Sequence, residues 1–222
     1  MKKSIKHLVI AVIALPALIG VSNFAKAQSD DMSSDKMKSA SGKMKMKDDK
    51  IKMKMDMSEM KSWPMSSQMA AKEMMDKYGK PNEATPTMMV WNNNGIWKRT
   101  IVSKEENKHD FPKTHMDCME QIVYYKVPID KAKMLDEFDG SVNIDRTQGF
   151  ISARCDKEEN NLLALNLSYD IITGKKTVAE ARKAYGEIIM AAMNGNKSEY
   201  MMKLMFSSNM SSPDSDVNTI GM

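Results

Sequence analysis

Methionine is concentrated near the start of the chain, where its thioethers are candidate ligands for soft metal ions. Eight methionines lie between residues 28 and 62, several of them two positions apart. A thioether is neutral and soft, and soft sulfur ligands select Cu(I) and similar ions. The pattern predicts soft-ion binding, with Cu(I) as the candidate ion. The candidate ligands are Met44, Met46, Met53, Met55, Met57 and Met60.

Other interpretations of the same segment stay open. Lysines alternate with the methionines, as in Lys43–Lys47, and their charge opposes cation binding. Alternation of this kind also fits an amphipathic strand, a membrane-surface segment or a low-complexity spacer. Methionine oxidises readily, so the segment could also consume oxidants.

A second group of candidate ligands is contiguous, with His109 nearby. Residues 115–119 combine an imidazole, a thiol and two thioethers, from which we take His115, Met116, Cys118 and Met119 as candidate metal ligands. The alternative is the start of a strand in which Cys118 forms a disulfide with Cys155. The sequence leaves both possibilities open.

Sequence signatures of enzymes are absent. The chain has no Gly-x-Ser-x-Gly elbow, no His-Glu-x-x-His, no phosphate-binding glycine loop and no Cys-x-x-Cys-His. Four neighbouring carboxylates resemble solvated helix-end and turn residues: Asp136, Glu137, Asp139 and Asp145. We therefore expect no catalysis.

The first 27 residues have the layout of a secretory signal peptide. A basic start precedes an apolar run from Leu8 to Val21, and Ala25-Lys26-Ala27 is a small-x-small cleavage pattern. The run is too short to span a bilayer, which needs about 20 residues. We expect a mature protein without a transmembrane segment, in the periplasm or secreted.

Removal of the signal would also remove the basic excess. The whole chain has 33 Lys+Arg and 29 Asp+Glu, and the signal holds four of the lysines and no acid. The mature chain would then carry no net charge. Nothing indicates nucleic acid as a partner, because a clustered basic surface would be expected for one. No protein partner is indicated.

Composition divides the mature chain into three parts. Residues 28–62 contain no aromatic side chain and only Ile51 as a branched aliphatic, so we expect a disordered Met/Lys-rich arm. Residues 63–206 are long enough for one domain. Residues 207–222 form a polar tail, which we also expect to be disordered.

Helices are predicted from apolar spacing and capping residues. The clearest begins at the capping box Thr177–Glu180 and ends near Gly195. Residues 158–173 fit a strand or a helix, and leucine content favours a helix. The other predicted helices are 66–78 and 129–138.

Strands are predicted around two hairpin turns and at two further apolar stretches. Residues 104–115 are expected to be a polar loop. The whole is predicted to be α+β, with a mostly antiparallel sheet and helices packed on one face. The strand candidates are 87–91, 96–103, 119–127, 141–144, 150–155 and, as an edge or closing strand, 200–206.

Two resemblances accompany these predictions. The composition of the arm resembles the methionine-rich segments of periplasmic copper- and silver-handling proteins, although it lacks their histidines. Residues 84–206 resemble an uncharacterised family of exported bacterial proteins, which implies one domain but no activity. The stretches that carry this second resemblance are 90–91, 97–99, 109–112, 138–142, 152–156 and 172–176.

Overall fold

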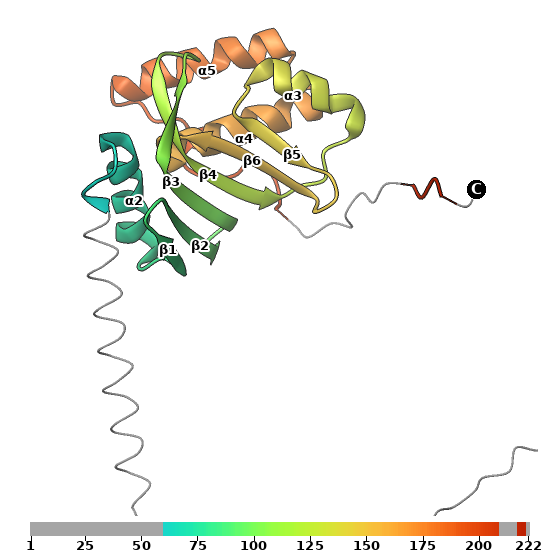
Figure 1. Cartoon of the computed structure of the whole chain (residues 1–222). Coiled ribbons are helices and arrows are strands. Elements are labelled where there is room, and N and C mark those ends of the chain that lie inside the picture. The colour runs from blue at the N-terminus through green and yellow to red at the C-terminus, as the bar shows by residue number, and fades with distance from the viewer. Residues whose placement is uncertain (1–59, 209–216, 221–222) are drawn as a thin grey trace, which may run out of the picture. The chain divides into compact units, whose positions relative to one another are not determined.

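The computed structural model describes residues 60–208 and 217–220 (Figure 1). A six-stranded sheet has the order β1-β2-β3-β4-β6-β5, and every neighbouring pair is antiparallel. The predicted signal peptide and almost all of the arm lie outside the described residues. The strands are β1 (Glu83–Thr85), β2 (Met88–Asn94), β3 (Trp97–His109), β4 (His115–Tyr124), β5 (Val142–Asp145) and β6 (Phe150–Cys155).

Helices cover one face of this sheet, which confirms the predicted α+β class. Helices α2 and α4 both reach the side chain of Gln121 on β4: its amide lies 3.7 Å from Met74 Sδ of α2, and its oxygen accepts from Asn161 of α4 at 3.1 Å. The helices are α2 (Met65–Tyr78), α3 (Ala132–Phe138), α4 (Glu158–Ile172) and α5 (Val178–Met193), with short 3-10 turns η1 (Ile129–Lys131) and η2 (Glu199–Met201).

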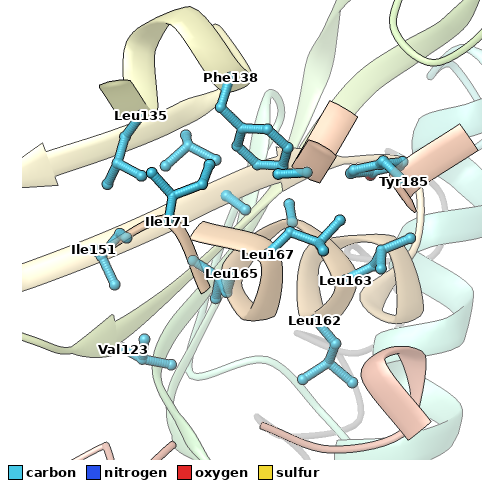
Figure 2. Packing of buried hydrophobic residues seen from close by; sticks show 14 of the residues in the cluster. Val123, Leu135, Phe138, Ile151, Leu162, Leu163, Leu165, Leu167, Ile171 and Tyr185 are labelled. Atoms are coloured by element: carbon cyan, nitrogen blue, oxygen red, sulfur yellow. The ribbon is translucent and has the colours of Figure 1, made fainter. Parts of the chain in front are cut away.

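The larger core forms between α4 and the β4–β6 half of the sheet (Figure 2). Leu163, Leu165 and Leu167 of α4 are fully buried, and Phe138 of α3 closes the core from above the sheet. Burying each such side chain contributes about 1.5–3 kcal/mol. Because α4 is buried on most of its surface, it lacks a clear amphipathic pattern. This explains why its sequence fits either helix or strand, and the favoured helix is confirmed.

A second core lies between α2 and the β2–β3 half of the sheet. Trp63, Trp91, Met74 and Cys118 are buried there, and Met60 packs against this group. Met60 is the one candidate ligand of the arm that the structure describes, and its side chain contacts this apolar core. Its contact with the core competes with any role as a free thioether ligand.

The buried carboxylate of Glu158 joins the two cores. It accepts hydrogen bonds from Trp97 Nε1, from Tyr78 Oη at 2.6 Å and from Lys77 Nζ at 2.6 Å. These donors come from β3 and α2, while Glu158 begins α4. One carboxylate therefore ties together both halves of the domain, and it raises the pKa of Tyr78, for which burial is the larger cause.

The predicted loop at 104–115 is wrong. Strand β3 continues to His109 and β4 begins at His115, so the two strands form a long hairpin with a turn of only five residues. The end of β3 alternates partly buried and exposed side chains rather than apolar and polar ones. A strand that buries little surface has no apolar alternation by which to recognise it.

The predicted strand at 200–206 is also wrong. Asn166 of α4 uses its side-chain amide to donate to the backbone oxygens of Tyr200 and Lys203, and its side-chain oxygen accepts from the backbone N–H of Met205. These bonds satisfy backbone groups that a sheet would otherwise pair. The segment therefore folds over α4 as the turn η2 and irregular chain. In the described part of the chain, no helix is long and apolar enough to cross a bilayer.

Candidate metal centre

Three potential metal ligands converge where the β3–β4 hairpin leaves the sheet. His109 is the last residue of β3 and lies opposite His115, the first residue of β4. Asp117 is two positions further along β4, so it lies on the same face as His115. One ligand atom from each residue lies within 4.8 Å of the others. Tight strand pairing thus places two imidazoles and one carboxylate on neighbouring positions.

The distances within this group are short. His115 Nε2 lies 3.0 Å from Asp117 Oδ1, and His109 Nδ1 lies 3.3 Å from Asp117 Oδ2. The ring centroids of the two histidines are 5.0 Å apart. The side chain of Asp117 is only 5% exposed, so this carboxylate depends on protein or ligand partners rather than on water.

A second carboxylate approaches from the C-terminal end of α3. His109 Nε2 lies 3.7 Å from Asp139 Oδ1. That oxygen also accepts from the backbone N–H and hydroxyl of Ser141, at 2.9 and 2.7 Å. The expectation that Asp139 is a solvated helix-end residue is wrong, since it is 2% exposed. The imidazole of His109 therefore has a carboxylate on each side.

The orientation of the His115 ring is set by the hairpin turn. Its Nδ1 lies 2.9 Å from the backbone oxygen of Lys113. A protonated Nδ1 donates to that carbonyl, and in the neutral ring Nε2 then presents its lone pair towards Asp117. This is how metal-binding histidines are commonly oriented. The backbone at Lys113 therefore prepares Nε2 of His115 for a ligand.

Without a metal, His115 is a strong base. Burial by itself lowers the pKa of its imidazole, but hydrogen bonding to the Asp117 carboxylate and to the Cys155 thiol outweighs this and raises the pKa to about 11. The pKa of Cys155 is raised in turn, chiefly by burial, although His115 acts to lower it. The surroundings of His115 therefore favour its protonated form when no metal is bound.

Two atoms of the site are buried without an aligned hydrogen bond. These are His109 Nδ1 and Asp117 Oδ1, although each lies within ion-pair distance of an opposite group. Buried polar atoms are nearly always hydrogen-bonded, so such atoms need a reason. A bound cation would supply a partner for both atoms.

Aromatic packing holds the hairpin turn against the domain. Phe111 packs on Tyr185 of α5 and Phe138 of α3, with ring centroids 5.1 and 6.2 Å apart. The guanidinium of Arg182 lies 3.9 Å from the Phe111 centroid and donates to the backbone oxygen of Phe138. The turn that orients His115 is therefore anchored by an apolar side chain and a cation–π contact.

A cavity of about 240 Å³ opens beside the centre, between α5 and the hairpin turn. His115 and Cys155 line it from the sheet, and Tyr185 and Met193 line it from α5. The metal-ligand group is thus next to a space that a small ligand or an ion can enter.

The predicted ligands at 115–119 separate in the structure. His115 lies in the centre, while Cys118 and Met119 are buried in the second core. Burial is the main reason that the pKa of Cys118 is raised to about 12, and the nearby Glu106 raises it further. Met116 is half-buried and lies beside Lys108 on the outer part of the hairpin. The four residues do not form one site.

The two cysteines are free thiols rather than a disulfide. Cys155 lies opposite Met119 in the sheet, so Cys118 is one position out of register. The thiol of Cys118 lies beside Ser67 of α2, whereas that of Cys155 lies beside His115.

Asp117 belongs to the centre and Asp139 lies beside it, and neither is among the ligands predicted from the sequence. Asp117 lies within residues 115–119, where the sequence analysis predicts only the imidazole and sulfur groups as ligands. A sequence signal did exist: two histidines flank a short segment with Pro112, and the second is followed at two residues by an acid. Such spacing suits a hairpin that brings both histidines together.

Of the other predicted ligands, Met44, Met46, Met53, Met55 and Met57 lie outside the described residues. The likeness of residues 84–206 to exported bacterial proteins stays a prediction. Neither a protein-family model, nor a curated protein, nor a solved structure matches this chain.

Proposed function

We propose that this is an exported metal-binding protein whose folded domain binds one transition-metal ion through His109, His115 and Asp117. The observation that carries the proposal is the convergence of one ligand atom from each residue within 4.8 Å. All three side chains are mostly shielded from solvent, with exposures of 19%, 14% and 5%. Such shielding favours a bound ion over freely hydrated side chains.

The ligand types narrow the class of ion. Imidazole nitrogens suit Zn(II), Cu(II) and other borderline ions, whereas Mg(II) and Ca(II) prefer sites made only of oxygen. Two histidines and one carboxylate are also a ligand set found in zinc sites with an open position. We therefore assign Zn(II) or Cu(II) as the ion, with the fourth position directed to solvent, to the cavity or to Asp139.

A bound metal ion would displace the proton that His115 carries in the metal-free site. His115 must lose a proton to bind, so metal and proton compete for the same imidazole. Because the pKa of His115 is about 11 without metal, the affinity should rise with pH across the neutral range. The carboxylate of Asp117 would balance half of the charge of a divalent ion.

The methionine-rich arm has a separate place in this proposal. Its thioethers would bind softer ions, such as Cu(I), that the imidazole–carboxylate group does not favour. Both parts would act outside the cytoplasm if residues 1–27 direct export. The arm and the domain would then cover two oxidation states of the same metal.

A Co(II) titration of the metal-stripped chain from residue 28 onwards tests the domain site. Co(II) gives visible absorption bands that report its ligands, and thioethers of the arm bind it poorly. We expect one equivalent to bind with micromolar or tighter affinity. Changing both His109→Ala and His115→Ala should weaken binding by at least about 100-fold, or about 2.7 kcal/mol.

The matched control is Asp130→Asn, which changes a 71% exposed carboxylate on η1 without touching the centre. It should leave Co(II) affinity unchanged. Equal affinity in the double histidine variant and the unchanged chain would refute the site. The domain would then be a non-catalytic envelope or interaction module in which the histidines and acids form only an ion-pair network.

A further inference from the structure

We propose that the cavity beside α5 is a second metal site, which takes a soft monovalent ion, Cu(I) or Ag(I), through Cys155, Met193 and Met201. All three sulfur-bearing side chains line the same space of about 240 Å³. This site shares no ligand with the three-residue centre, although Cys155 contacts His115 and both line the cavity. It assigns a role to a buried thiol that the first site leaves unused.

The three sulfurs come from different elements that meet at this cavity. Cys155 ends β6, Met193 ends α5, and Met201 belongs to η2. Cys155 and Met201 are almost fully buried, at 4% and 3% exposure, whereas Met193 is 62% exposed at the rim. Two buried sulfurs with a long, exposed thioether side chain at the mouth suit capture of an ion from solution.

The chemistry of the lining favours a soft ion. Thiolate and thioether ligands select Cu(I) over harder divalent ions. Thioethers need no deprotonation, so only Cys155 has to release a proton. That proton leaves to solvent as the Cu–S or Ag–S bond forms, with no change in oxidation state of the ion or the sulfur.

The charges around the cavity favour a monovalent ion. Lys113, Lys157 and Lys197 line it together with Asp156 and Glu159. A thiolate with a monovalent cation is neutral overall, whereas a divalent cation would add a net positive charge beside the lysines. Lys197 is already paired with Glu159 in an ion pair. The lining therefore disfavours divalent ions, the class that the first centre favours.

Two contacts in the empty cavity must change when the ion binds. Lys113 Nζ lies 3.6 Å from Met193 Sδ, and Cys155 Sγ lies 3.4 Å from Asp156 Oδ1. Both hydrogen bonds are weak, because sulfur is a weak donor and acceptor, and the lysine is exposed. A soft ion would replace each of these weak hydrogen bonds with a stronger sulfur–metal bond, so binding of the ion is favoured.

The test is an Ag(I) titration of the chain from residue 28 onwards, labelled with ¹³C at the methionine methyl groups and followed by NMR. We expect the Met193 and Met201 methyl signals to shift in a saturable way. Met190 is the internal control, because it is exposed on the same helix and does not line this cavity. Its signal should stay in place.

Cysteine variants separate this site from the arm. Cys155→Ser should reduce Ag(I) affinity at Met193 and Met201 by at least tenfold, while Cys118→Ser should leave it unchanged. If Cys155→Ser does not fold, Met201→Leu replaces the thioether at similar volume and should remove the saturable shift of Met193. Unmoved Met193 and Met201 signals, or shifts that persist in Cys155→Ser, would overturn the second site. The Co(II) titration is independent of this result, so failure of either site can be recognised separately.

Discussion

Replacing Asp117 by Asn should destabilise the metal-free protein by about 3 kcal/mol at pH 7. The substitution keeps the size of the side chain but removes the charge that faces His115 at 3.0 Å and His109 at 3.3 Å. Removing one partner of a buried ion pair typically costs about 3–5 kcal/mol. We take the lower end, because the imidazolium can respond by releasing its proton.

The pKa of His115 gives a second, independent value for this loss of stability and the direction in which it changes with pH. It is raised from 6.5 to about 11, and one pKa unit corresponds to about 1.4 kcal/mol. The interactions that hold the proton, among them the hydrogen bond to Asp117, therefore contribute at most about 5 kcal/mol at pH 7. Because the folded pKa lies above the unfolded one, this stability is complete below about pH 6.5 and is lost as pH rises through about 11.

Urea denaturation in the presence of a chelator measures the effect at pH 7.0 and pH 10.5. The difference between the unchanged chain and Asp117→Asn should shrink strongly at the higher pH, and Asp130→Asn should show little effect at either. A difference below about 1 kcal/mol at pH 7, or one of the same size at both pH values, would refute the ion-pair reasoning.

Three further predictions concern the fold. Glu158→Ala leaves the buried Trp97 and the half-buried Tyr78 without their acceptor, and it should lower the free energy of unfolding by about 3 kcal/mol. Glu187→Ala at an exposed pair should change it by less than about 0.5 kcal/mol. A similar loss in both would contradict the role of Glu158. Thr177→Ala removes the capping box of α5 and should cost about 1 kcal/mol in thermal or urea unfolding; no loss would count against the cap. Cys118 and Cys155 should both titrate as free thiols in denaturant without reductant, and finding no thiol would show a disulfide.

Local sequence signals predicted most of the fold. The capping box at Thr177 predicts α5, and the hairpin turn between the strand candidates 87–91 and 96–103 predicts the β2–β3 hairpin. These signals work because capping and turn geometry depend on a few adjacent residues. The errors fell where a long-range contact decided the structure, as where Asn166 binds the backbone of residues 200–205.

The candidate centre was only partly predictable. His115 was identified because its neighbours offer ligand atoms, but its true partners lie across a hairpin and at the end of α3. Pairing His109 with His115 requires the register of a strand whose exposed end has no apolar alternation. Asp139 looked solvated because sequence does not show that α3 ends over the hairpin.

X-ray absorption spectroscopy of the chain loaded with one equivalent of Zn(II) tests the domain site most directly. We predict nitrogen and oxygen ligands at about 2.0–2.1 Å with the outer-shell scattering of two imidazoles, and loss of the imidazole signal in the variant that carries both His109→Ala and His115→Ala. A spectrum dominated by sulfur at about 2.3 Å, or one unchanged in that variant, would contradict metal binding at this centre.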